Sequence, residues 1–328
     1  MRGGGPRKPT TLMLKQATSL FPSDAAEKRR FMDALLLGES REQAIIVLEP
    51  RPEIGAFPRE RRMVWQPEFI ERLRSDFRPA RHPLYEKGAF YSLDASSALA
   101  ASTMLAIPTP PKRILDLCAS PGGKSVFAWR AFRPELLVAN EIIRKRHPSL
   151  IANLDRCHIT GSRVTAADPG VWGRRFPETF DLVLADAPCS GQSMLAKGDD
   201  AQGCFHPNMI DMNVGRQRRI LGNAFQTCRP GGYILYTTCT YSHKENERVI
   251  EWLFKEYEGE VTPVERPEMA EFRSKYADFP CYRLFPHQGL GAGMFSCLLR
   301  KAGEIPEDPA SLEGLPGAWV YGRAPESA

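Results

Sequence analysis

Residues 180–191 read FDLVLADAPCSG. The apolar run over residues 180–185 has the length and composition of a buried parallel strand, and Asp186 and Cys189 follow it directly. A second stretch, GYILYTTCT at residues 232–240, places Cys239 after a similar run. In an open α/β sheet, ligands and chemistry gather at the carboxyl ends of the strands. A parallel sheet would therefore bring these two thiols close together, either as packing residues or as a nucleophile.

The sequence around these stretches alternates between strands and helices. Candidate strands cover residues 113–118, 136–141, 163–167, 180–185 and 233–236, and candidate helices cover 95–105, 123–132, 144–156, 207–228 and 243–257. Segments 282–284 and 294–299 add two expected edge strands. Strands separated by helices predict an α/β fold with a mostly parallel, seven-stranded sheet covered on both faces.

The first 92 residues differ in charge from the rest of the chain. They hold 17 Lys/Arg and 12 Asp/Glu, whereas residues 93–328 hold 27 of each. Such an excess of basic residues is common in proteins that bind the phosphate backbone of a nucleic acid. The alternative is that these residues only form a solvated surface.

We expect four parts along the chain. Residues 1–15 form a flexible basic tail, 16–87 a small, mainly helical RNA-binding module, 88–302 the catalytic domain and 303–328 a loose C-terminal tail. Within the module, Asp24 opens a helix that ends at Gly38, and Pro67 starts a second short helix. Asp94 is the expected N-cap of the helix over 95–105.

Composition excludes several classes of protein. Apolar residues make up 42% of the chain, but no apolar run reaches the roughly 18 residues that a membrane span needs. The basic N-terminus lacks the apolar core of a signal peptide, so a cytoplasmic protein is expected. The eight cysteines form no CxxC pair and no zinc-like spacing with histidine, so we expect neither disulfides nor a metal site.

The first strand–helix turn reads DLCASPGGKS at residues 116–125. Its glycines let the backbone approach a ligand, and the helix start offers free N–H groups. The stretch is neither a Walker A loop nor GxGxxG, which argues against ATP and NAD bound by those loops. A simple tight turn is the alternative.

Three acidic residues, Glu141, Asp168 and Asp186, end successive predicted strands. The first is well placed for ribose hydroxyls, the second for an adenine amino group and the third for a cationic amine. S-adenosylmethionine has all three parts. Each carboxylate alone could instead cap a helix.

These motifs resemble those of a known family, the Sun/Nop-type RNA 5-methylcytosine methyltransferases, whose bacterial members include RsmB-like rRNA enzymes. The resemblance covers about residues 91–301, and the family's entry motif overlaps its start as GAFYSLDASS (88–97), with Leu93 where the family usually has Gln. The motifs that carry it are DLCASPGGKS (116–125), DAPCSG (186–191), YTTCTY (236–241) with ENE (245–247), RLFP (283–286) and GMF (293–295).

The resemblance implies a Rossmann-like class I methyltransferase fold and S-adenosylmethionine as the cofactor. It also implies the cofactor-binding residues, with Arg146 matching a basic position of the family's second motif. They are Cys118, Ala119, Ser120, Pro121, Gly122, Gly123, Lys124, Glu141, Arg146, Asp168 and Asp186.

Carbon 5 of cytosine is a poor nucleophile, and addition of a thiolate at carbon 6 activates it. A hydrogen bond at ring nitrogen 3 would help, and Asp186 is the candidate donor if it is protonated or shares a proton. From chemistry alone either thiol could attack. Pro188-Cys189 resembles the arrangement of DNA cytosine methyltransferases, but the family resemblance implies Cys239 as the nucleophile and Cys189 as the residue that assists product release.

The expected substrate is a single-stranded or flipped cytosine of RNA, because a base must leave its stack to reach buried thiols. Ribosomal RNA is the expected class, and transfer RNA stays open. A methyltransferase acting on an exocyclic amine or a protein side chain, and a non-enzymatic RNA-binding assembly factor, are the rival hypotheses. We expect a monomer.

Overall fold

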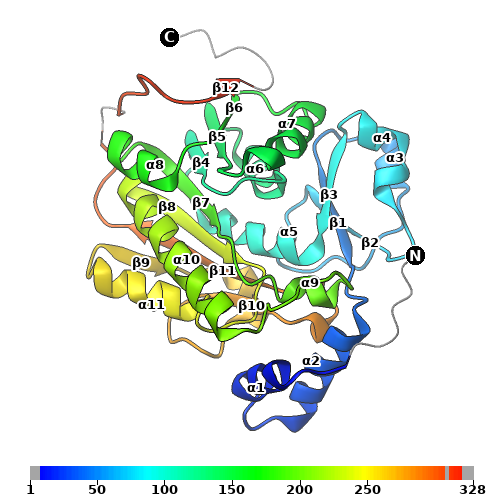
Figure 1. The fold of residues 1–328 in the computed structure, drawn as a ribbon. Coiled ribbons are helices and arrows are strands. Elements are labelled where there is room, and N and C mark those ends of the chain that lie inside the picture. The colour runs from blue at the N-terminus through cyan, green and yellow to red at the C-terminus, as the bar shows by residue number, and fades with distance from the viewer. Residues whose placement is uncertain (1–7, 307–309, 320–328) are drawn as a thin grey trace.

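The computed structural model describes residues 8–306 and 310–319 (Figure 1). Its centre is a run of five parallel strands in the order β8-β7-β4-β5-β6. The strands are β4 (Arg113–Asp116), β5 (Leu136–Asn140), β6 (Ser162–Thr165), β7 (Phe180–Asp186) and β8 (Cys228–Thr238). The predicted α/β fold with a mostly parallel sheet is confirmed.

Antiparallel strands extend the sheet on both sides, so that it has nine strands within the described residues. They are β9 (Val261–Val264), β10 (Tyr282–Leu284), β11 (Met294–Lys301) and β12 (Ala318–Trp319). The sequence predicted β11 as an edge strand, but it lies between β8 and β10 and also pairs with β9. The prediction of seven strands omitted β9 and β12, which are too short to show a hydrophobic period.

Helices cover both faces of the sheet, and alternate strand residues point to each face. Leu182 and Leu184 pack on one side with α5 (Ala95–Ser102), α6 (Gly123–Phe132) and α7 (His147–Arg156). Val183 and Ala185 pack on the other side with α8 (Pro169–Arg175), α10 (Pro207–Thr227) and α11 (Glu247–Glu256). The short elements are α9 (Ser193–Ala196), η2 (Thr103–Ala106), η3 (Arg144–Arg146), η4 (Pro267–Phe272) and η5 (Pro286–Gln288).

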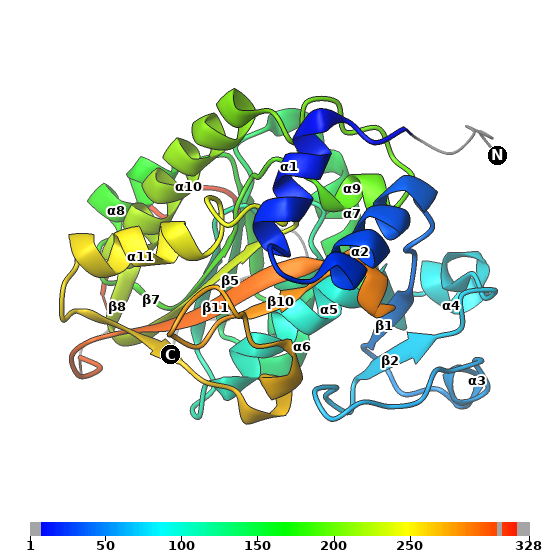
Figure 2. The same ribbon diagram turned by 90° about the horizontal axis from the view of Figure 1, so that it is seen from below.

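The N-terminal part contains a small antiparallel sheet as well as helices, and the prediction of a mainly helical module omitted this sheet. Its strands, in the order β2-β1-β3, are β1 (Gln43–Val47), β2 (Ile70–Leu73) and β3 (Phe90–Asp94). Its helices are α1 (Thr11–Leu20), α2 (Ala25–Leu37), α3 (Pro52–Gly55), η1 (Pro79–Arg81) and α4 (Pro83–Glu86). Both views place α1 and α2 next to each other (Figures 1 and 2).

The helix predicted to start at Pro67 is wrong, and its residues explain why. Residues 69, 70, 73 and 77 have helical spacing, but Ile70 and Leu73 instead form a strand beside β1, whose β-branched residues favour pairing. Asp24 and Asp94 cap their helices, as predicted, by accepting from Glu27 N at 2.8 Å and from Ser96 N at 2.9 Å.

The two predicted tails are more ordered than expected. Helix α1 begins at Thr11, where the sequence predicted a flexible segment up to residue 15. Leu315 is buried and β12 pairs with β6, although residues 303–328 were predicted to be loose. Residues 1–7, 307–309 and 320–328 of these tails lie outside the described residues.

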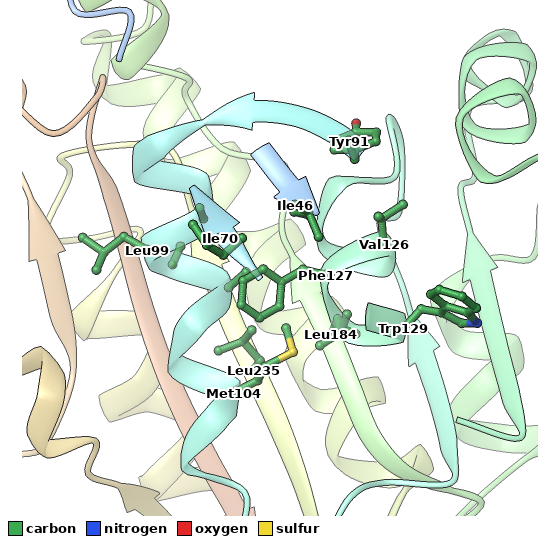
Figure 3. Packing of buried hydrophobic residues seen from close by; sticks show 14 of the residues in the cluster. Ile46, Ile70, Tyr91, Leu99, Met104, Val126, Phe127, Trp129, Leu184 and Leu235 are labelled. Atoms are coloured by element: carbon green, nitrogen blue, oxygen red, sulfur yellow. The ribbon is translucent and has the colours of Figure 1, made fainter. Parts of the chain in front are cut away.

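The small sheet and the large sheet share one hydrophobic core. Ile46 and Ile70 pack in the same cluster as Phe127 of α6 and Leu184 of β7 (Figure 3). Strand β3, which follows the predicted domain boundary at residue 87, pairs with β1, which precedes it. Within the described residues, no helix has both the length and the apolar character to span a membrane.

A buried ion pair joins α11 to β10. Both carboxylate oxygens of Glu247 accept hydrogen bonds from the Arg283 guanidinium, and Ser274 Oγ donates to Oε1 at 2.6 Å. Arg283 Nη1 also donates to Tyr241 O at 3.0 Å, which fixes the loop after Cys239. Burial opposes ionisation of Glu247, but the charge and hydrogen bonds of Arg283 outweigh it and lower the pKa to about 2.

We expect Glu247→Gln to destabilise the protein at pH 7 by about 3 kcal/mol, because it leaves the Arg283 charge buried without its partner. The folded pKa of Glu247 lies below its ordinary value of 4.5, so its stabilisation is complete above pH 4.5 and is lost as the pH falls toward 2. Urea unfolding across this pH range should show the two proteins converging in acid. Glu251→Gln, which removes a more exposed pair with Arg248 on the same helix, is the control and should cost less than about 1 kcal/mol. A constant difference between wild type and Glu247→Gln at every pH would contradict the assignment.

Candidate active site

The loop between β4 and α6 lies where the strand order reverses, with β5 and β6 on one side of β4 and β7 and β8 on the other. This is the position where open α/β sheets bind ligands. Gly122 has φ +115°, which other residues rarely adopt, and a Cβ on Gly123 would lie 3.3 Å from Tyr91 Cε1. Glycine at these positions therefore permits the backbone conformation of the loop and its close packing against Tyr91.

Two buried polar residues hold this loop in place. Asp116 accepts from Ser125 Oγ at 2.7 Å and from Cys118 N at 3.2 Å, and burial raises its pKa to about 7. Asn140 accepts from Ala119 N at 2.8 Å and donates to Leu117 O at 3.1 Å. Sequence reasoning did not select either residue, although Asp116 stands at the start of the loop motif.

Glu141 and Arg146 lie together against the same loop. Glu141 is buried, and its Oε1 accepts from Ile143 N at 2.9 Å. Its Oε2 lies 3.0 Å from Arg146 Nη1, and Arg146 Nη2 donates to Ser120 O at 2.7 Å. Arg146 thus connects the carboxylate after β5 to the loop after β4.

Asp168, three residues beyond β6, and Asp186, the last residue of β7, have different partners. Asp168 caps α8, accepting from Gly170 N at 2.9 Å, and a hydrogen bond from Arg219 of α10 lowers its pKa. Asp186 Oδ2 lies 2.6 Å from Lys124 Nζ, and its Oδ1 accepts from Thr237 Oγ1 at 2.8 Å. Lys124 therefore links the loop after β4 to the strand that precedes Cys189.

The two cysteines selected from the sequence meet at the ends of β7 and β8. These parallel strands pair Asp186 with Thr237, and the loops that follow bring Cys189 Sγ to 3.3 Å from Cys239 Sγ. Cys239 is exposed and Cys189 is partly covered. Cys118, by contrast, is held in its loop, and burial raises the pKa of its thiol well above the ordinary value.

The environment favours the thiolate at Cys239. A hydrogen bond from Cys189 lowers the pKa of Cys239 to about 7. Ser193 and Lys197 contribute in the same direction, and Asp186 and the partial desolvation of the thiol oppose them. The same hydrogen bond, with burial, raises the pKa of the Cys189 thiol. The thiolate is the reactive form of cysteine, so these shifts make Cys239 the more readily ionised thiol of the pair.

A buried carboxylate, Glu245, holds the two cysteine loops together. Its Oε1 accepts from Ser190 N at 2.7 Å, and its Oε2 accepts from Ser190 Oγ at 2.6 Å and from Thr240 Oγ1 at 3.3 Å. Gln217 of α10 donates to Glu245 Oε1 at 3.2 Å and to Pro188 O at 3.0 Å. Burial raises the pKa of Glu245. The motif around residues 245–247 was visible in the sequence, but this bridging role was not.

Within the described residues, no group of three or more His, Cys, Asp or Glu side chains has the geometry of a metal site. The candidate site therefore consists of the loop over residues 117–124, the three strand-end carboxylates and the cysteine pair.

Residues 103–300 match the family model described as 16S rRNA methyltransferase RsmB/F. Ribosomal RNA small subunit methyltransferase F of Escherichia coli O9:H4 (strain HS) is 35% identical over 225 residues, which cover 68% of this chain and 47% of that protein. The enzyme of the same name from Erwinia tasmaniensis is 34% identical over 225 residues, which again cover 68% of this chain and 47% of that protein. The chain thus spans about half the length of the curated relatives it matches.

Solved structures share the fold. The structure of NSun6 from Pyrococcus horikoshii with SFG superposes with a TM-score of 0.74 at 17% identity, covering 90% of this chain and 99% of that one. A methyltransferase homolog from Pyrococcus horikoshii gives a TM-score of 0.69 at 21% identity, covering 89% of this chain and all of that one. These similarities confirm the predicted Rossmann-like methyltransferase fold.

The alkylation rate of Cys239 by iodoacetamide should rise with pH around a midpoint near 7, because only the thiolate reacts. In Cys189→Ala the midpoint should move upward, since the thiolate loses its S–H donor. Mass spectrometry of the Cys239 peptide measures both profiles. Cys157→Ala, which removes a buried thiol elsewhere, is the control and should keep the wild-type midpoint. An unchanged midpoint in Cys189→Ala would show that the two sulfurs do not interact.

Proposed function

The chain belongs to the RsmB/F family of 16S rRNA methyltransferases, and on this premise we propose that it methylates carbon 5 of a cytosine in RNA through a covalent cysteine adduct. Ribosomal RNA is the proposed substrate class. The observation that carries the proposal is the 3.3 Å contact between Cys189 and Cys239 at the carboxyl ends of β7 and β8, next to Asp186. A cytoplasmic location and a monomeric state, expected from the sequence, belong to the same proposal.

The cofactor is S-adenosylmethionine, whose sulfonium supplies an electrophilic methyl group. The residues at the carboxyl ends of the parallel strands fit this cofactor. Glu141 Oε2 is buried without a hydrogen-bond donor of good geometry, which leaves an acceptor for a ribose hydroxyl. The loop that contains Gly122 and Gly123 lies where the strand order reverses, and we assign Asp168 and Asp186 to the adenine and amino groups.

We assign the attack to Cys239. Its thiolate forms a bond to carbon 6 of the ring, and the electrons of the 5,6 double bond move to carbon 5, which becomes nucleophilic. Negative charge then spreads toward ring nitrogen 3. We assign the contact with that nitrogen to Asp186, which lies 2.6 Å from the Lys124 ammonium.

Cys189 is suited to the second half of the reaction. Its pKa is raised first by the hydrogen bond with Cys239 and also by the charge of that residue. Once Cys239 is bonded to carbon 6 it carries no charge, so both effects disappear and Cys189 loses its thiol proton to water more readily. It then accepts the proton from carbon 5, the double bond re-forms, and the sulfur–carbon bond electrons return to Cys239.

The basic excess of the first 92 residues supports contact with RNA phosphates by the N-terminal part. The alternative acceptors, an exocyclic amine or a protein side chain, would leave the paired thiols without a role. Transfer RNA remains compatible with the same site chemistry, and mapping of methylated cytosines in total RNA distinguishes it from ribosomal RNA.

We expect Cys239→Ala to reduce methyl transfer by more than about 10³-fold and to form no adduct with RNA that carries 5-fluorocytosine. The fluorine cannot leave as a proton does, so the wild-type adduct is trapped. Cys189→Ala should form the adduct and release it poorly even from ordinary cytosine. Denaturing gels measure both, with Cys157→Ala as the control that behaves like wild type. An undiminished adduct in Cys239→Ala would reverse the two roles.

A further inference from the structure

A groove with a volume of about 340 Å³ is lined in part by the segment that follows Cys239 in the chain. One wall is α1, which contributes Lys15. The opposite wall is the segment 242–244, which begins three residues after Cys239. The first turn of α10, with Phe205 before it, and Tyr276 complete the lining. Its volume lies in the range of small-molecule and nucleotide sites.

The charge of this groove is one-sided. Its described lining includes Lys15, Lys244 and His243 and no carboxylate, whereas the groove beside α2 has residues of both charges, with Asp24, Glu27 and Glu271 as well as Arg273, Lys275 and Arg283. Lys15 is exposed and has no ion-pair partner among the described residues. The groove therefore favours an anion.

Lys244 and His243 each have a partner within the protein, but both can still contact a bound phosphate. Lys244 Nζ lies 2.8 Å from Asp211 Oδ1, but both side chains are more than half exposed, so the pair is weak and a phosphate can compete for the lysine. His243 Nδ1 lies 3.0 Å from Glu247 Oε2, whose charge is already committed to Arg283.

The groove also offers aromatic surface. The rings of His243 and Tyr276 are 5.9 Å apart between centroids and tilted by 53°, and Phe205 lines the same space. Positive charge combined with aromatic rings is the usual composition of a site for single-stranded nucleic acid, where phosphates meet cations and bases stack on rings.

Both walls are held rigidly relative to Cys239. Tyr241 N donates to Gln192 Oε1 at 3.1 Å, and Tyr241 O accepts from Arg283. On the other wall, Met13 and Ala17 of α1 pack in one cluster with Phe205. The groove is therefore a preformed continuation of the loop that carries Cys239.

We propose that this groove binds a nucleotide of the RNA strand adjacent to the target cytosine, with its phosphate between Lys15 and Lys244 and its base against His243 and Tyr276. This inference rests on the proposed function, because it assumes that Cys239 acts on RNA. It gives α1, outside the matched family region, a direct part in substrate binding.

The test is the salt dependence of binding to a fluorescein-labelled oligocytidylate, followed by anisotropy from about 50 to 200 mM KCl. Removing one lysine that neutralises a phosphate should reduce the slope of log K against log salt by about 0.7. Lys15→Gln and Lys244→Gln should each show this decrease, and the double variant should show about twice as much. Lys255→Gln, which removes an exposed charge from α11, is the matched control and should keep the wild-type slope.

Adduct formation with a 5-fluorocytosine oligonucleotide is measured on the same proteins. If wild type forms the adduct and both lysine variants keep its slope and affinity, the groove proposal is overturned while the proposed function stands. If wild type neither binds the RNA nor forms the adduct, both are overturned. The unfolding temperature of each variant is compared with that of wild type. Equal temperatures would show that a smaller salt slope comes from weaker phosphate binding and not from a loss of folding.

Discussion

The buried carboxylate of Glu245 is the constraint on which the site depends. Strands β7 and β8 place the two cysteine loops side by side, and beyond the strands Ser193 N donates to Cys239 O at 3.1 Å. Glu245 adds a side-chain link by accepting hydrogen bonds from Ser190 in one loop and Thr240 in the other. The free-energy cost of burying the Glu245 charge is offset by these hydrogen-bond donors and by Gln217. Because Glu245 holds the two loops together, the sulfur atoms of Cys189 and Cys239 lie 3.3 Å apart.

Shared contacts of this kind extend outward from the site. Arg283 neutralises Glu247 and also holds the carbonyl of Tyr241, so the ion pair that stabilises α11 and β10 positions the loop after Cys239. Lys197, whose charge favours the Cys239 thiolate, pairs with Asp94 at 3.2 Å, the residue that caps α5. The thiol pair is thus surrounded by groups that the fold itself needs.

Features encoded locally were predictable from the sequence. The apolar run before Cys189 and the glycines of the 116–125 loop specify strand and turn within a few residues, and α6 spans the predicted 123–132. Features that depend on distant partners were not. Ile70 and Leu73 become a strand only because β1 offers an edge, and the role of Glu245 requires Ser190, 55 residues away. The pairing of Lys124 with Asp186 likewise appears only once the strands are ordered.

The central claim is that sulfur adds to the pyrimidine ring so that carbon 5 accepts the methyl group and then loses its hydrogen. Release of tritium from small-subunit ribosomal RNA labelled at carbon 5 of cytosine tests it most directly. The account predicts one tritium released to water for every methyl group transferred. Methylated RNA that retains its tritium would contradict it, because the methyl group would then reside on another atom.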